Sequence, residues 1–206
     1  MSKAEETKAY IIQQSAALFN QKGFAGLSMS DIMQATGLKK GGIYNHFSSK
    51  DELVLAAFDH VISVLGQRYL QAIQSRQDEG AIAQLNGILD VFEQNMQDEM
   101  FKGGCPLLNT ATESDDTHPA LRERTQQAIG RWHQSICQVV RQGVKQGELQ
   151  PDADPDAVAT VLIAVLEGAV MMTKLYDDAR YVRHSLVHLR EHFDKLAKSG
   201  VASEKS

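Results

Sequence analysis

The sequence has few of the residues that mark the more specialised classes of protein. It has 206 residues, of which only two are cysteine, four are proline and one is tryptophan. Two cysteines without a C-x-x-C spacing provide neither a disulfide framework nor a structural zinc motif. Ala, Leu, Gln and Glu dominate, and no stretch of alternating β-branched residues suggests a sheet. We therefore expect an all-α protein.

Long apolar runs are missing as well. The N-terminal segment M-S-K-A-E-E-T-K is polar and charged, and no uninterrupted apolar run approaches the ~20 residues that a membrane helix needs. We expect a cytoplasmic protein that has no membrane partner. The hydrophobic content of 43% is nevertheless sufficient for a real core in one large or two small domains.

Positive charge is scarce overall but is concentrated at the start of the chain. The formal net charge is −5, yet residues 1–50 contain six lysines against three acidic residues, a net of +3 that leaves −8 for the remainder. This asymmetry predicts a basic head on an acidic body. An excess of +3 suits local contacts with phosphates better than bulk polyelectrolyte attraction.

Residues 28–50, S-M-S-D-I-M-Q-A-T-G-L-K-K-G-G-I-Y-N-H-F-S-S-K, have the layout of two short helices around a glycine turn. Ser28 or Ser30 can cap the first helix, and Gly37 permits the left-handed backbone that ends it. Ser48 or Ser49 can cap the helix that follows. The positions that can form a shared inward face are Ile32, Ala35, Leu38, Ile43 and Phe47.

The remaining groups of this segment face outward and are suited to phosphates and base edges. They are Lys39, Lys40, Gly41, Gly42, Tyr44, Asn45, His46 and Lys50. Short helix pairs joined by glycine also occur in bundles that bind no nucleic acid, so this pattern alone leaves both interpretations open.

The longer stretch G-L-K-K-G-G-I-Y-N-H-F-S-S-K-D-E-L resembles the DNA-binding signature of TetR/AcrR-type transcriptional regulators, and the resemblance runs from about Lys8 to Leu55. It implies a three-helix helix-turn-helix domain at 1–48, a helical regulatory and dimerisation domain at 49–198 and a flexible tail at 199–206. Lys39 and Gly42 depart from the Ser and the Thr or Ala that are commoner there, which affects the base preference. The DNA-binding residues that the resemblance implies are Lys40, Tyr44 and Lys50 on phosphates, Lys39, Gly41, Gly42, Asn45 and His46 nearest the bases, and Ser28.

Helical spacing continues through the rest of the chain and predicts helices at about 50–76, 81–100, 107–114, 119–146, 155–176 and 179–198. The segment 157–172 is apolar around most of its circumference and needs cover on more than one side. It can be the core helix of a monomer. In the regulators that this chain resembles, the last two long helices pair with their symmetry mates, which implies a homodimer through about 121–146 and 157–176. Such a dimer reads a palindromic double-stranded operator.

The segment K-G-G-C-P-L-L-N-T-A-T-E, residues 102–113, is the candidate sensor. Two glycines relax the backbone, and Cys105 precedes Pro106 at the start of a short helix, where backbone amides would stabilise a thiolate. The segment resembles the Gly-Gly-Cys segment of one TetR subgroup, whose members respond to electrophiles, oxidants or aromatic ligands. The alternative is that Cys105 is a small buried hydrophobe at a helix junction.

A ligand pocket, if the chain has one, is expected among the helices after the head. The residues chosen for its lining by apolarity and position are Phe92, Met96, Phe101, Leu108, Trp132, Met171 and Tyr176.

No cofactor and no metal are expected. His133 and Cys137 are spaced i, i+4 on one helix face, but two ligands do not make a metal site, so packing is the preferred interpretation. The stripe His184, His188 and His192 is expected to face solvent.

Taken together, these features predict a homodimeric transcriptional repressor that a small molecule, or modification of Cys105 by an electrophile, releases from its operator. One alternative is a cysteine-dependent enzyme with Cys105 as nucleophile and His118 or His133 as base, although no oxyanion or acid partner is apparent. Another is a dimeric interaction module that binds no DNA.

Overall fold

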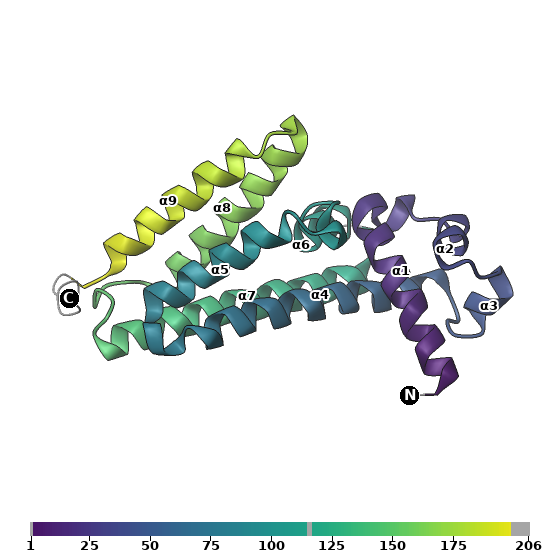
Figure 1. Cartoon of the computed structure of the whole chain (residues 1–206), viewed down its shortest axis with the longest axis horizontal. Coiled ribbons are helices and arrows are strands. Elements are labelled where there is room, and N and C mark those ends of the chain that lie inside the picture. Colours follow the sequence, from purple (N-terminus) through teal and green to yellow (C-terminus); the bar gives the residue numbers. More distant parts are fainter. Residues whose placement is uncertain (1, 115–116, 199–206) are drawn as a thin grey trace. The chain divides into compact units, whose positions relative to one another are not determined.

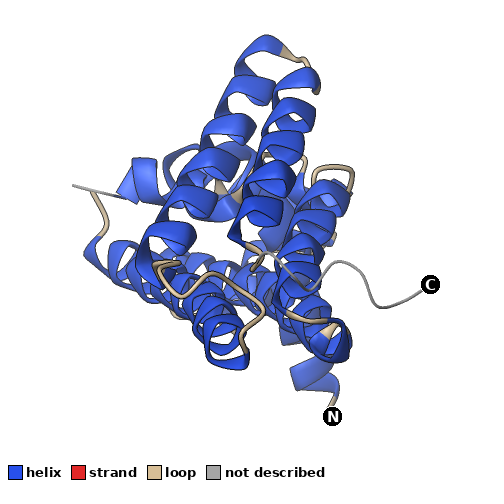
Figure 2. Ribbon diagram, turned by 90° about the vertical axis from the view of Figure 1, so that its left-hand side faces the viewer, coloured by secondary structure: helices blue, strands red, loops and turns tan. Residues whose placement is uncertain are grey.

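The computed structural model describes residues 2–114 and 117–198, so the tail predicted at 199–206 lies outside the described residues. Within them the chain forms helices and no β-strand (Figure 2), apart from a single bridge between Leu149 and Ala197. The all-α prediction is confirmed. The α-helices are α1 (Lys3–Gly26), α2 (Met29–Thr36), α3 (Lys40–Tyr44), α4 (Lys50–Ser75), α5 (Ala81–Asn95), α6 (Pro106–Ser114), α7 (Pro119–Gln146), α8 (Pro155–Tyr176) and α9 (Arg180–Leu196).

The first of two compact units contains the described residues of Met1–Leu65 and Met96–Ala128. It holds α1 to α3, α6 and the first parts of α4 and α7, and α1 packs against both α2 and α6 (Figure 1). Its core includes Ile11, Phe19 and Phe58, and the rings of Phe19 and Phe58 meet edge to face with centroids 6.4 Å apart. A break in α1 at Gly23, where φ is 71°, turns the last residues of this helix away from its axis.

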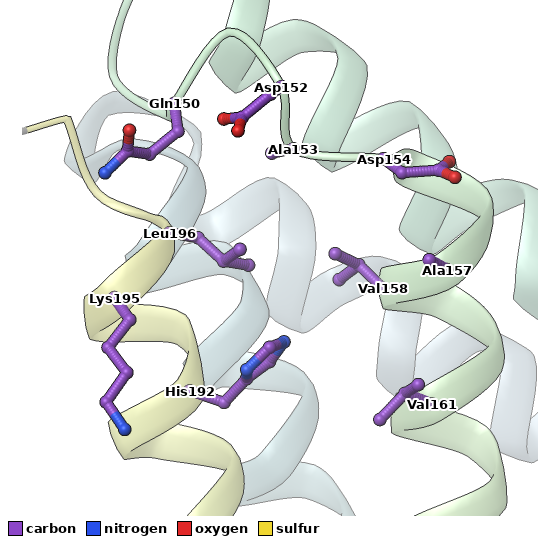
Figure 3. Close-up of a pocket in the computed structure, with 10 residues that line it drawn as sticks. All are labelled: Gln150, Asp152, Ala153, Asp154, Ala157, Val158, Val161, His192, Lys195 and Leu196. Carbon is purple, nitrogen blue, oxygen red and sulfur yellow. The ribbon is translucent and has the colours of Figure 1, made fainter.

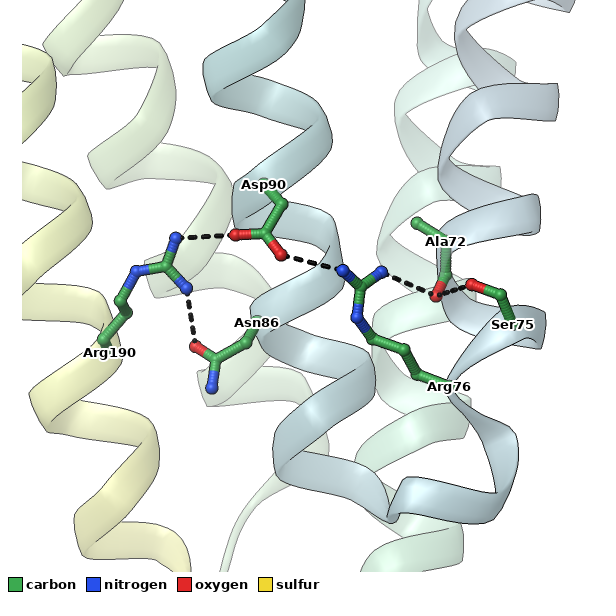
Figure 4. Close-up of polar contacts among 6 residues, drawn as sticks. All are labelled: Ala72, Ser75, Arg76, Asn86, Asp90 and Arg190. Carbon is green, nitrogen blue, oxygen red and sulfur yellow. Dashed lines mark hydrogen bonds and ion pairs between the residues drawn. The ribbon is translucent and has the colours of Figure 1, made fainter.

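The second unit contains the described residues of Gly66–Asn95 and Ile129–Ser206. In this unit α9 runs back alongside α8 and also packs against α5 (Figure 1). The carboxylate of Asp90 on α5 accepts hydrogen bonds from Arg76 at 2.9 Å and from Arg190 of α9 at 2.8 Å (Figure 4). Half-exposed ion pairs of this kind contribute little to stability. These two contacts do fix how α5 and α9 lie against each other and against the C-terminal end of α4.

Two of the expected helix ends differ from the structure by two residues or more. The helix expected at 81–100 ends at Asn95 and is followed by a 3₁₀ turn, η2 (Glu99–Phe101), because Asp98 caps that turn by accepting a hydrogen bond from the amide of Met100. The helix expected at 179–198 is α9, which stops at Leu196, where Ala197 turns to pair with Leu149.

Helix α8 carries apolar side chains on its exposed side as well as on its buried side. By length and composition it could cross a membrane, since the mean hydropathy of its most apolar stretch is 1.8, but only 33% of that stretch is buried. Core helices of soluble proteins pass the same test, so this is a weak indication. The large exposed apolar residues on α8 are Val161, Met171, Met172, Leu175 and Tyr176.

Candidate nucleic-acid interface and sensor segment

Helix α2 begins and ends as its sequence predicts. Ser28 is its N-cap, and the Ser28 hydroxyl and the Asp31 carboxylate each accept a hydrogen bond from the other residue's backbone amide, which is a complete capping box. Gly37 leaves the helix with φ 70°. This conformation strongly favours glycine, so the turn to α3 is set by one residue.

Asp31 is held ionised by its neighbours. Hydrogen bonds from Lys22, from the Ser28 hydroxyl and from the Ser28 backbone amide lower the pKa of Asp31 far below the ordinary value of 3.8. The Lys22 ammonium pairs directly with this carboxylate and thereby joins α1 to the first turn of α2. The Ser28 hydroxyl is therefore engaged within the protein, where it also donates to Asp31.

Helix α3 has a buried side and an outward side. Ile43 and, just after the helix, Phe47 are 1% and 2% exposed, and these two residues anchor it. Gly42 and His46 are half-buried. The residues of this segment that are exposed are Lys39, Lys40, Gly41, Tyr44 and Asn45. All five belong to the set predicted to contact DNA.

Two lysines of this region lie over aromatic rings. The Lys40 ammonium is 5.7 Å from the centroid of Tyr44, so two of the three residues predicted to hold phosphates lie together on the outward side. Lys50 differs, because its ammonium donates a hydrogen bond to the carbonyl oxygen of Phe24 at 2.9 Å and lies 4.9 Å from that ring's centroid. Part of its donor capacity is thus used to tie the start of α4 to the end of α1.

Helix α3 has little intrinsic stability. Its N-cap, Lys39, makes no side-chain cap hydrogen bond, and two of its five residues are Gly41 and Gly42. Each glycine in a helix costs about 1 kcal/mol relative to alanine. A Cβ built on Gly41 meets nothing within 4 Å, and one on Gly42 meets only the Cβ of Leu38 at 3.8 Å. Internal packing therefore does not require either glycine.

The candidate sensor segment packs directly against α1. A Cβ on Gly103 would lie 2.0 Å from the backbone oxygen of Asn20, so only glycine fits. The Asn20 amide donates to the carbonyl oxygens of Met100, at 3.3 Å, and Gly104, at 3.0 Å. The Asn109 amide donates back to the backbone oxygen of Asn20 at 3.3 Å and to that of Gly103 at 3.0 Å. Cys105 directly follows Gly104, its backbone oxygen accepts a hydrogen bond from the Asn109 backbone amide at 3.0 Å, and it is 8% exposed.

A second contact joins α6 to the end of α1. The carboxylate of Glu113 accepts hydrogen bonds from the backbone amides of Phe24, at 2.8 Å, and Ala25, at 2.7 Å. Those amides are available because Gly23 interrupts the helix. A Cβ on Gly23 would lie 2.5 Å from a carboxylate oxygen of Glu113, so the break and the contact require the same glycine.

The residues predicted to line a ligand pocket differ in how far they are exposed to solvent. Phe92, Phe101 and Trp132 are buried, with Trp132 stacked on Tyr69 at 5.4 Å between centroids. Met96 and Leu108 are half-buried. Met171 and Tyr176 are 55% and 60% exposed, and we assign them instead to the apolar face of α8.

A cavity of about 480 Å³ lies in the second unit, between the start of α8 and the end of α9 (Figure 3). Asp152 and Asp154 lie on its α8 side, and His192 and Lys195 lie on its α9 side. None of the residues predicted to line a ligand pocket contributes to it.

Comparison with known proteins gives matches over most of the chain. Residues 11–57 match the model of bacterial regulatory proteins of the tetR family. Residues 81–189 match the model of the tetracyclin repressor-like C-terminal domain.

Solved structures and curated relatives agree with these matches. A TetR transcriptional regulator from Chloroflexus aurantiacus is 41% identical with a TM-score of 0.89, over 96% of this chain and 98% of that one. A TetR-family regulator from Cytophaga hutchinsonii is 33% identical with a TM-score of 0.82, over 96% and 98%. The HTH-type transcriptional repressor NemR of Escherichia coli is 22% identical over 90% of this chain and 92% of its own length.

Proposed function

Because the chain belongs to the TetR family of bacterial transcriptional regulators, we propose that it is a homodimeric repressor that a small molecule or modification of Cys105 releases from a palindromic operator. Proteins of this family are soluble DNA-binding regulators and not enzymes, which removes the cysteine-dependent enzyme from consideration. Cytoplasmic localisation is part of the proposal. The main observation in support of DNA binding is the outward side of α3. Five residues predicted to contact DNA are exposed there, while Ile43 and Phe47 on the opposite side are buried.

In this proposal the contacts with DNA divide into two kinds. Lys40 and Tyr44, which lie together, hold phosphates and fix the orientation of α3. Lys39, Gly41, Gly42, Asn45 and His46 lie nearest the bases. Ser28 and Lys50 already make internal hydrogen bonds, so they contribute to DNA binding chiefly by placing α2 and the start of α4.

The dimer is proposed to form through the exposed apolar face of α8 and α9. That face consists of the exposed α8 residues Val161, Met171, Met172, Leu175 and Tyr176, with Val187 on α9. The resemblance implied 121–146 and 157–176, but no large apolar side chain of the described part of α7 is exposed. Contiguous exposed apolar surface marks interaction sites, and two related heads about 34–36 Å apart can read a palindrome.

Release requires a signal that favours one conformation over another. Cys105 is buried and directly follows Gly104, whose carbonyl oxygen accepts a hydrogen bond from Asn20 of α1, so a bulky adduct on its sulfur would disturb the segment that packs against the first helix of the DNA-binding head. We propose that this displacement, or binding of a ligand in the body, changes how the heads fit the operator.

The body also contains two buried hydrogen-bond donors that a small-molecule signal could engage. The side-chain nitrogens of Asn95 and Trp132 are buried and have no hydrogen-bond partner among the described residues. Both residues pack beside one turn of α4, where Asn95 accepts from Arg68 at 2.5 Å and Trp132 stacks on Tyr69. Two buried donors favour a ligand with aromatic surface and hydrogen-bond acceptors.

The DNA-binding part is tested on the region upstream of the protein's own gene by footprinting, followed by titration of the protected duplex. Lys40→Ala and Tyr44→Ala should weaken binding across sequences and lower the salt dependence, by about one unit of log–log slope for the lost lysine contact. Lys145→Ala, an exposed lysine in the last turn of α7, is the matched control. If Lys40→Ala and Tyr44→Ala bind like the control, the dimeric module without DNA binding becomes the better interpretation.

The sensor part is tested by adding a quinone or an aldehyde to the complex with DNA. Cys105→Ser should bind DNA normally but no longer be released, whereas Cys137→Ser should be released like the unmodified protein. Release of Cys105→Ser by the same reagents would reject the thiol as the sensor and leave a ligand in the body as the signal.

A further inference from the structure

The second cysteine lies in a cluster that the sequence did not predict. Cys137 and His133 are one turn apart on α7, and the fold brings Asp156, from the first turn of α8, beside them. A ring nitrogen of His133, the sulfur of Cys137 and a carboxylate oxygen of Asp156 all lie within 4.8 Å of one another. These three residues are the only such group of potential metal ligands among residues 2–114 and 117–198.

The spacing of the two α7 ligands suits a shared ion. The Cys137 sulfur is 3.6 Å from Nδ1 of His133. Two donors that bind one tetrahedral zinc ion at about 2.3 Å (sulfur) and 2.1 Å (nitrogen) lie about 3.6 Å apart. The pair therefore needs no rearrangement to hold an ion between them.

The third ligand needs only a side-chain rotation. Oδ1 of Asp156 is 3.6 Å from Nε2 of His133, on the other edge of the ring, and the Asp156 side chain is 79% exposed. Rotation of this exposed side chain is inexpensive and can bring the carboxylate to the Nδ1 side. The Thr160 hydroxyl, 3.3 Å from Nε2, can then hold the ring in its orientation.

The environment favours a cation with affinity for sulfur. Cys137 is 2% exposed, and its thiol now donates a hydrogen bond to the backbone oxygen of Pro155 at 3.3 Å. Asp154 and Asp156 add negative charge beside it, and Arg141 is the cation nearby.

We propose that His133, Cys137 and Asp156 form a binding site for a thiophilic divalent cation of the zinc type, with water as the fourth ligand. Imidazole, thiolate and carboxylate are all zinc ligands, and three protein ligands plus water is a common arrangement for this ion. The thiol proton passes to solvent as the ion binds. The ion would join the middle of α7 to the start of α8 and is independent of the sensor at Cys105.

The test is a titration of metal-free, tag-free protein with Co²⁺, which reports its ligands by absorption. One ion per chain should bind with a thiolate-to-cobalt charge-transfer band, and Zn²⁺ should displace it. The band should be absent in Cys137→Ser and intact in two controls, Cys105→Ser and His188→Ala. His133→Ala and Asp156→Asn should each weaken binding at least about tenfold, since even partners of metal ligands contribute about 10–100-fold.

The variants separate this site from the alternatives. A band that persists in Cys137→Ser, that disappears in Cys105→Ser, or that never forms overturns the proposal, as does unchanged affinity in Asp156→Asn. If Cys137→Ser loses its helical circular dichroism, His133→Ala decides, because the His133 side chain is 26% exposed and its removal leaves the core intact.

Discussion

At the scale of single residues, several glycines are required by a specific neighbour. Gly103 is required by the backbone of α1, and Gly23 is favoured by its φ of 71° and lies where a Cβ would displace the carboxylate of Glu113. Other glycines have no such constraint, since a Cβ on Gly130 or Gly66 would meet nothing within 4 Å. Residue type alone therefore does not reveal which glycines support the junction of α1 with α6.

Gly103→Ala should destabilise the protein by about 1–3 kcal/mol, because the new methyl group must displace the backbone of Asn20. Gly130→Ala on α7 is the matched control and should stabilise by up to about 1 kcal/mol. Urea denaturation followed by circular dichroism measures both. Equal stabilities of the two variants would contradict the close packing described here.

At the scale of helices, the cap of α2 makes stability depend on pH. The folded pKa of Asp31 lies below its unfolded value, so its contribution is fully present above the unfolded pKa of 3.8 and is lost as the pH falls towards the folded pKa. The carboxylate joins α1 and α2 through Lys22.

Asp31→Asn should therefore lower the free energy of unfolding at pH 7 and have a smaller effect at pH 3. Urea titrations of the variant and the unmodified protein at the two pH values provide the comparison. Glu6→Gln, an exposed acidic residue of α1, controls for the loss of one negative charge. A destabilisation that is the same at both pH values would assign the role of Asp31 to something other than its charge.

Helix α3 is a second element where stability and function can be separated. Gly41→Ala has room for its methyl group and should stabilise the helix by up to about 1 kcal/mol, yet weaken DNA binding if Gly41 lies nearest the bases as proposed. Gly66→Ala, in an exposed part of α4, should give similar stabilisation with unchanged DNA affinity. Thermal unfolding and duplex titration together check this, and unchanged affinity of Gly41→Ala would remove that residue from the interface.

The sequence predicted the helices well where the residues that begin or end a helix lie within that helix or beside it in the chain. Pro119 and Pro155 begin α7 and α8, and Ser28 and Gly37 bound α2. It did not predict the end of α5 at Asn95, where the Asn95 side chain accepts a hydrogen bond from Arg68, a contact between residues 27 apart that local periodicity does not reveal. The same reason applies to the sites. The outward residues of α3 follow from local periodicity, whereas the meeting of Asp156 with His133, and of Asn20 with Gly104, depends on tertiary packing.

At the scale of the whole molecule, the contacts divide the chain into units that are each discontinuous in sequence. The functional boundary at residue 48 is a prediction that this division does not test. Helices α4 and α7 each contribute to both units. The apolar face of α8 and α9 lies wholly in the second unit, so its role in assembly can be tested without altering the head.

Met171→Asp with Leu175→Asp should convert the proposed dimer to a monomer, because a carboxylate in an apolar interface is costly to bury. The monomer should bind a palindromic duplex much more weakly than the dimer. Leu70→Asp is the matched control, since Leu70 is 50% exposed on α4. Sedimentation velocity gives the mass, and a dimer that survives the double substitution would place the interface elsewhere.

The hydrogen bonds of Asn20 have a consequence for synthesis of the protein. Their acceptors, Met100 and Gly104, lie 80 and 84 residues further along the chain. Because a ribosome delivers the chain from its N-terminus at about 5–20 residues per second, the DNA-binding segment emerges seconds before these acceptors do. During synthesis Asn20 therefore stays exposed to water until the sensor segment has been made. A product truncated before residue 100 would lack these contacts of the first helix.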